Sequence, residues 1–123
     1  MSNCKVLIAD DVFANQFLLA SMLEELSVGF KTVSNGKEVL DELPNDKYDI
    51  IFMDIEMPVM NGIEATKQIK NDFRYKEIPV IALTAHDLDE FQGQFTEAHF
   101  DSIVEKPFTI DSISQVLAKF NFQ

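Results

Sequence analysis

Apolar and polar residues alternate in blocks along the chain, and the blocks are of two kinds. Short runs of mainly branched apolar residues, such as KVLIA at 5–9, are typical of buried strands, and DIIFM at 49–53 lacks the polar alternation of a half-exposed strand. Longer stretches repeat apolar residues at three- and four-residue steps, which is the spacing of an amphipathic helix. The pattern predicts strands at 5–9, 30–34, 49–53, 78–84 and 102–105, and helices at 12–26, 37–43, 62–72, 87–98 and 109–120.

Single residues refine these helices. Asn61 and Thr109 stand where N-caps are expected, because their side chains can accept hydrogen bonds from the first free backbone amides. Pro44 should end the second helix, and Gly93 should weaken the fourth.

Five strand–helix repeats with short connections predict one α/β domain over residues 1–123. Such alternation is typical of a doubly wound (βα)5 fold, in which a five-stranded parallel sheet carries helices on both faces. The more polar run FKTVS at 30–34 should lie at an edge of the sheet. In sheets of this kind, ligands bind beyond the carboxyl ends of the strands.

Five polar residues follow the strands at that edge. Asp10 and Asp11 follow the first strand, Asp54 the third, Thr84 ends the fourth, and Lys106 follows the fifth. Three carboxylates at close range repel one another, and a hard cation such as Mg²⁺ would relieve the repulsion. Singly, each residue has an ordinary alternative role, and Asp11 could simply cap the first helix.

A metal beside a lysine and a hydroxyl also forms a receptor for a phosphoryl group. The metal and Lys106 would neutralise the phosphoryl oxygens, and Thr84 would donate a hydrogen bond. Asp54 could then act as the nucleophile and form an acyl phosphate.

The composition excludes several classes of protein. The net charge of −11 makes direct binding to nucleic acid unfavourable. No apolar run approaches the roughly 18 residues of a membrane span. Cys4 is the only cysteine, which suits the reducing cytoplasm where we expect the protein to act.

Four motifs carry a resemblance to a known family. They are DD at 10–11, MDIEMPVMNG at 53–62, LTA at 83–85 and EKPF at 105–108. With these motifs, essentially the whole chain resembles the response-regulator receiver domain, the CheY-like family, whose fold is flavodoxin-like. The stretch MDIEMPVMNGIEAT and Asn15 lean toward receivers of hybrid kinases and phosphorelays.

The resemblance implies a phospho-accepting switch of a two-component or phosphorelay system, with Asp54 as the phosphoacceptor. It implies that Asp11 and Asp54 bind Mg²⁺ directly, that Asp10 acts through a water, and that the backbone carbonyl of Glu56 completes the protein ligands. The side chains of Glu56 and His86 should flank the path of the hydrolytic water, unless they are merely exposed. Such a domain catalyses only its own phosphorylation and dephosphorylation, so we do not expect an enzyme in the ordinary sense.

The resemblance also assigns Thr84 to sensing the phosphoryl group and Lys106 to pairing with it, and it implies a cis bond between Lys106 and Pro107. Three positions depart from the family. Ile103 stands where receivers often carry an aromatic switch residue, His99 replaces a common glycine, and Val12 stands where many relatives have a polar residue. If the turn at His99 needs a positive φ, histidine tolerates it better than most residues.

The implied partner is a histidine kinase or a histidine phosphotransfer protein, with an output partner also possible. The first helix should bury a stripe formed by Asn15, Leu18, Leu19, Met22, Leu23 and Leu26. At about 100° per residue, Phe13 and Phe17 then point toward solvent, unless one ring tucks under a loop. We therefore expect these rings to dock the helical bundle of the phosphodonor.

Two other functions compete with this reading. One is a Mg²⁺-dependent phosphohydrolase with an aspartyl nucleophile, but enzymes of the haloacid-dehalogenase type place a DxD motif after the first strand, where this chain has adjacent acids. The other is a pseudo-receiver that binds partners without accepting phosphate, and the complete five-residue set argues against it.

A flavin-binding protein of similar topology would need a Ser-, Thr- and Gly-rich loop where this chain has DDVFAN.

Overall fold

Five parallel strands form the single sheet of this chain in the computed structural model, which describes residues 4–85, 93 and 95–120. The strands are β1 (Lys5–Ala9), β2 (Gly29–Val33), β3 (Ile50–Asp54), β4 (Val80–Thr84) and β5 (Ser102–Glu105). Their order across the sheet is β2-β1-β3-β4-β5, and every neighbouring pair is parallel. The predicted α/β fold is confirmed, and so is the edge position of β2.

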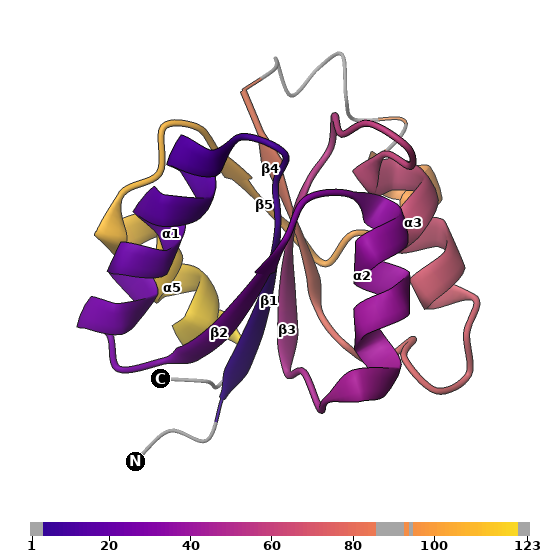
Figure 1. The fold of residues 1–123 in the computed structure, drawn as a ribbon, viewed down its shortest axis with the longest axis horizontal. Coiled ribbons are helices and arrows are strands. Elements are labelled where there is room, and N and C mark those ends of the chain that lie inside the picture. The colour runs from indigo at the N-terminus through magenta and orange to yellow at the C-terminus, as the bar shows by residue number, and fades with distance from the viewer. Residues whose placement is uncertain (1–3, 86–92, 94, 121–123) are drawn as a thin grey trace.

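Helices cover both faces of the sheet (Figure 1). They are α1 (Phe13–Glu25), α2 (Gly36–Glu42), α3 (Gly62–Lys70) and α5 (Ile110–Lys119), with a short 3-10 helix η1 (Leu43–Asn45) after α2. Figure 1 shows α1 and α5 on one face and α2 and α3 on the other. Residues 95–98 are helical too, but most of the helix predicted at 87–98 lies outside the described residues. None of the helices in the described ranges is long and apolar enough to cross a membrane.

The two faces of β3 feed two separate parts of the core. All five residues of β3 are buried, as its uninterrupted apolar sequence predicts. Ile51 and Met53 pack into the cluster under α2 and α3, whereas Ile50 and Phe52 pack into the cluster under α1 and α5. Because β3 packs on both faces, its last residue, Asp54, is held firmly at the carboxyl end of the sheet.

The predicted helix caps are present. The side chain of Asn61 accepts a hydrogen bond from the amide of Glu64 at 2.8 Å, and Thr109 forms a capping box with Ser112. Pro44 does not terminate the second helix directly, because the chain leaves α2 through the 3-10 turn η1, where Pro44 lies in the first turn and needs no amide donor.

One position of the predicted stripe on α1 is wrong. Leu19 and Leu23 are fully buried, but Leu18 is 40% exposed. The helix is rotated so that the half-buried Gln16 turns toward the sheet. Phe17 is nevertheless exposed, as predicted.

Three of the described residues other than glycine adopt a positive φ, and they are Ser27, Val59 and His99. His99 has φ 65°, so the turn before β5 does need the left-handed conformation that histidine tolerates. Val59 has φ 68° in a tight turn in which the amide of Met60 donates to the carbonyl of Pro58 at 2.7 Å. For a β-branched residue this conformation is strained, and Val59 is 78% exposed, so packing does not compensate.

Gly62 begins α3 directly against the backbone of Asp54. A Cβ atom at Gly62 would lie 2.1 Å from the Asp54 carbonyl oxygen and 2.8 Å from the Met53 side chain. The amide of Gly62 donates to the Ile55 carbonyl at 2.8 Å, which fixes this close approach. The missing side chain therefore allows the loop after β3 to fold tightly behind the carboxylate.

We predict that Gly62→Ala lowers the free energy of unfolding by about 2 kcal/mol, because the added methyl group forces the backbone of Asp54 to move. Gly93→Ala is the matched control, since a Cβ there meets nothing within 4 Å and the residue is helical. The control should gain about 0.5–1 kcal/mol. Chemical denaturation measures both, and equal effects of the two substitutions would contradict this account of Gly62.

Candidate phosphoacceptor site

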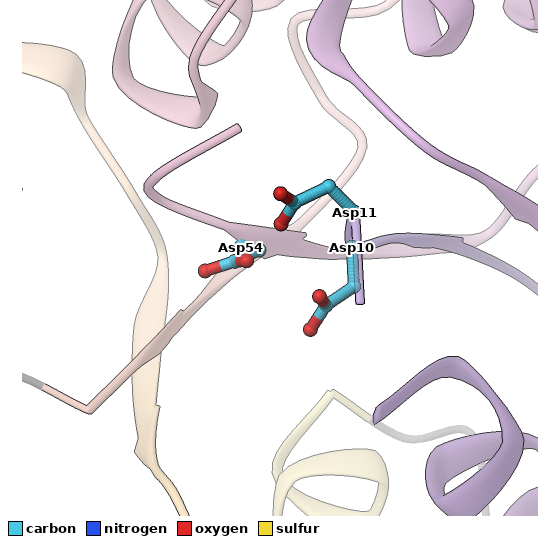
Figure 2. Close-up of side chains that lie close together, drawn as sticks. All are labelled: Asp10, Asp11 and Asp54. Carbon is cyan, nitrogen blue, oxygen red and sulfur yellow. The ribbon is translucent and has the colours of Figure 1, made fainter. Parts of the chain in front are cut away.

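Three carboxylates converge where β1 and β3 end. Each of Asp10, Asp11 and Asp54 has an oxygen atom that lies within 4.8 Å of the corresponding oxygens of the other two. Figure 2 shows the Asp10 and Asp11 side chains leaving opposite sides of the chain after β1, beside Asp54 at the tip of β3. Asp10 and Asp54 are buried, with 1% and 7% of their surfaces exposed, whereas Asp11 faces solvent. Two negative charges are therefore held close together away from water.

Lys106 lies between the two buried carboxylates. Its Nζ atom lies 3.2 Å from Asp10 Oδ2 and 3.4 Å from Asp54 Oδ1. The backbone amide of Lys106 donates to the Thr84 carbonyl at 2.8 Å. This bond fixes the backbone of Lys106 beside the end of β4, directly after β5. The Lys106–Pro107 bond is cis, as the resemblance implied.

The loop after β1 is organised by Asp10 rather than by Asp11. Asp10 Oδ1 accepts a hydrogen bond from the amide of Val12 at 2.9 Å, while Oδ2 faces Lys106. Val12 is the N-cap residue of α1, and no side chain caps that helix. The alternative role of Asp11 as a helix cap is therefore wrong, and its carboxylate remains exposed beside Asp54.

A cavity of about 270 Å³ opens over these groups. Its lining residues come from the ends of β1, β3, β4 and β5, and they are Asp11, Val12, Asp54, Ile55, Glu56, Leu83, Thr84, Ala85 and Lys106. Thr84 is 1% exposed, and Glu56 is exposed at the rim. The structure thus brings together all five residues predicted at the strand ends.

Burial raises the pKa of Asp54 to about 6, and the nearby charge of Asp10 acts in the same direction. Lys106 lowers this pKa but does not cancel the two stronger effects. Ionised Asp54 is therefore destabilising in the metal-free protein, which is the electrostatic condition that a bound cation would relieve.

The remaining predicted positions have mixed outcomes. Phe13 and Phe17 are 76% and 65% exposed, and their ring centroids lie 6.5 Å apart on the outer face of α1. Ile103 is half-buried and packs against the core under α2 and α3. His86 lies outside the described residues.

The family model of the response regulator receiver domain matches residues 6–118. The chain belongs to the response regulator receiver domain family. It is 35% identical over 122 residues to two-component response regulator 24 of Arabidopsis thaliana, covering 98% of this chain and 86% of that protein. It is 32% identical to the peroxide stress-activated histidine kinase mak1 of Schizosaccharomyces pombe, covering 95% of this chain but only 8% of the kinase.

Solved structures of receivers have the same fold. Chemotaxis protein CheY4 of Vibrio cholerae superimposes with a TM-score of 0.89 at 26% identity, covering 95% of this chain and 98% of that one. The receiver domain of the Pseudomonas aeruginosa kinase PA1611, solved with a magnesium ion in its active-site cleft, gives 0.88 at 27% identity over 95% of this chain and 96% of that one. The receiver of Saccharomyces cerevisiae Ssk1, solved with the histidine phosphotransfer protein Ypd1, gives 0.87 at 26% identity over 97% of this chain and 89% of that one. This receiver domain is thus a phospho-accepting switch of a two-component or phosphorelay system.

The raised pKa of Asp54 predicts a pH-dependent stability in the absence of metal. The folded protein binds the Asp54 proton more tightly than the unfolded chain does, so stability falls as pH rises from about 4 through about 6. Asp54→Asn cannot ionise, and its stability advantage over the wild type should grow by about 3 kcal/mol at most between pH 4 and pH 7.5.

Denaturation in EDTA at a series of pH values measures this difference. Glu25→Gln, which changes an exposed carboxylate at the other end of α1, is the matched control. A flat pH profile for Asp54→Asn would refute the electrostatic description of the site.

Proposed function

We propose that this receiver domain accepts a phosphoryl group on Asp54 in a reaction that depends on Mg²⁺. The observation that carries the proposal is the placement of Lys106 between two buried carboxylates, with an exposed carboxylate and a buried threonine on the same cavity. Carboxylate and carbonyl oxygens are the ligands that Mg²⁺ prefers, and this donor set fits it. Asp11 and Asp54 would hold the ion directly, Asp10 through water, and Glu56 through its carbonyl.

The transfer step needs one nucleophile and charge neutralisation. A carboxylate oxygen of Asp54 attacks the phosphorus of phosphohistidine, a P–O bond forms as the P–N bond breaks, and the electron pair returns to the imidazole nitrogen. Bound Mg²⁺ supplies positive charge to the phosphoryl oxygens. Once an Asp54 oxygen is bonded to phosphorus, the carboxylate no longer carries its own charge, and Lys106 pairs with a phosphoryl oxygen instead. The Thr84 hydroxyl donates a hydrogen bond to another phosphoryl oxygen.

Incubation with Mg²⁺ and a small phosphodonor such as phosphoramidate, followed by intact-mass measurement, tests this function. The wild type should gain one phosphoryl group, and the gain should be lost in EDTA and in Asp54→Asn. Asp41→Asn, which removes an exposed carboxylate of α2, is the control and should be phosphorylated normally. A phosphoryl group retained in Asp54→Asn would place the acceptor elsewhere.

The phosphodonor would contact α1 beside the cavity. Val12 lines the cavity and is 47% exposed, and the exposed rings of Phe13 and Phe17 continue the apolar surface along the helix. A donor that places its histidine against Asp54 must lie over this surface, and aromatic side chains are enriched at the centres of interfaces. The Ypd1 complex of a structurally similar receiver supports a histidine phosphotransfer protein or a histidine kinase as the partner.

We predict that Phe13→Ala and Phe17→Ala each slow phosphotransfer from the cognate donor about tenfold, equivalent to about 1.4 kcal/mol of lost binding. Phosphorylation by phosphoramidate should not change. Phe73→Ala is the matched control. Phe73 is 87% exposed, but it follows the C-terminal end of α3, whereas the N-terminal end of that helix lies against Asp54. Equal losses with both donors, or no loss with the cognate donor, would contradict this docking surface.

The other functional assignments rest on the resemblance to receiver domains. The domain would catalyse only its own phosphorylation and dephosphorylation, and the exposed side chain of Glu56 would flank the path of the hydrolytic water. The same role for His86 stays a prediction. Ile103 stands where receivers often carry an aromatic switch residue. A phosphohydrolase is the competing function, and it would release many equivalents of inorganic phosphate per protein from a phosphate ester, which a phosphate-release assay measures. Four other expectations stay predictions. They are the output partner, the cytoplasmic location, the absence of nucleic-acid and membrane binding, and the extent of the domain within its protein.

A further inference from the structure

The side chain of Gln16 ties α1 to the loop that carries Asp10 and Asp11. Its Nε2 atom lies 2.5 Å from the Asp10 carbonyl oxygen and 3.1 Å from the Val33 carbonyl oxygen, with Ser34 Oγ at 3.4 Å. Carbonyl oxygens can only accept, so the nitrogen of the amide must face them, and one NH₂ group can donate to both. Gln16 therefore links the ends of β1 and β2.

These bonds act on the peptide group between the two aspartates. The Asp10 amide donates to the Val33 carbonyl at 3.2 Å, and the Asp10 carboxylate accepts from the Val12 amide. Gln16 holds the remaining polar group of this residue, its carbonyl. Asp11 follows directly and is exposed, so its position depends on the backbone rather than on packing around its side chain.

We infer that Gln16 is a positioning residue for the divalent cation, acting through the Asp10 carbonyl without touching the ion. The inference rests on the proposed function, because it assumes that Asp10, Asp11 and Asp54 hold Mg²⁺. Partners that orient metal ligands commonly change metal affinity about 10- to 100-fold when they are removed. Gln16 belongs to none of the motifs that identify the family, and its role follows only from its contacts.

Isothermal titration of Mg²⁺ into the unphosphorylated protein tests the inference. Gln16→Met keeps the length of the side chain but removes the donor, and its Mg²⁺ dissociation constant should rise about tenfold. Leu26→Ala is the control for stability, because Leu26 packs in the core under α1 and α5, away from the aspartates. It should lower the Tm without changing Mg²⁺ affinity.

The outcomes separate the two proposals. A wild type that binds no Mg²⁺ would overturn the proposed function. A wild type and a Gln16→Met variant with dissociation constants within twofold of each other would overturn the role of Gln16 alone. Any substitution of Gln16 that removes the hydrogen-bond donor should weaken Mg²⁺ binding in the same way.

A measurement on the wild type keeps the inference testable if Gln16→Met does not fold. Mg²⁺ binding and the Gln16 hydrogen bonds should stabilise each other, since coupling between two sites is reciprocal. In NMR spectra, the side-chain amide protons of Gln16 should exchange with solvent more slowly than those of the exposed Gln115, and Mg²⁺ should slow them further. Exchange of Gln16 that is as fast as that of Gln115, or that does not respond to Mg²⁺, would contradict the inference.

Discussion

The repulsion between Asp10 and Asp54 is the constraint on which the site depends. Both carboxylates are buried, and the single ammonium group of Lys106 lies within 3.4 Å of each. One positive charge cannot balance two buried negative charges and the exposed Asp11 beside them. The protein therefore keeps a deficit of positive charge where a cation and then a phosphoryl group would be received.

The fold maintains this unfavourable arrangement through rigid elements on every side. β3 is packed on both faces, so Asp54 cannot retreat from Asp10. Gly62 lets α3 begin against the backbone of Asp54, and the strained turn at Val59 leads the chain there. On the other side, Gln16 and Val12 hold Asp10 at its carbonyl and its carboxylate. The packing and hydrogen bonds around the site therefore offset the electrostatic repulsion between the carboxylates.

The periodicity of the sequence was sufficient for the fold class and for the convergence of the site. Parallel strands carry their terminal residues to one edge, so Asp54 and Lys106 could be placed together without any knowledge of side-chain contacts. The caps at Asn61 and Thr109 were also predictable, because they depend on residues only three apart. Local sequence and tertiary structure agree at these positions.

Features that depend on distant contacts were not predictable. The rotation of α1 that exposes Leu18 and turns Gln16 inward brings the Gln16 amide to the carbonyl groups of Asp10 and Val33, at the ends of β1 and β2. The tight contact at Gly62 and the positive φ of Val59 arise only when the loop after β3 closes against α3. The sequence alone does not single out Gln16, because α1 also carries the polar residues Asn15, Ser21, Glu24 and Glu25. Only once the helix is placed on the sheet does a polar side chain that faces it require a partner.

Thermal unfolding as a function of Mg²⁺ concentration tests most directly whether crowded carboxylates define this site. At constant ionic strength, the Tm of the wild type should rise with Mg²⁺ as mass action requires. Asp11→Asn should unfold at a higher temperature than the wild type in EDTA, because it removes repulsion, and should respond to Mg²⁺ much less. A wild-type Tm that is indifferent to several millimolar Mg²⁺ would contradict the account.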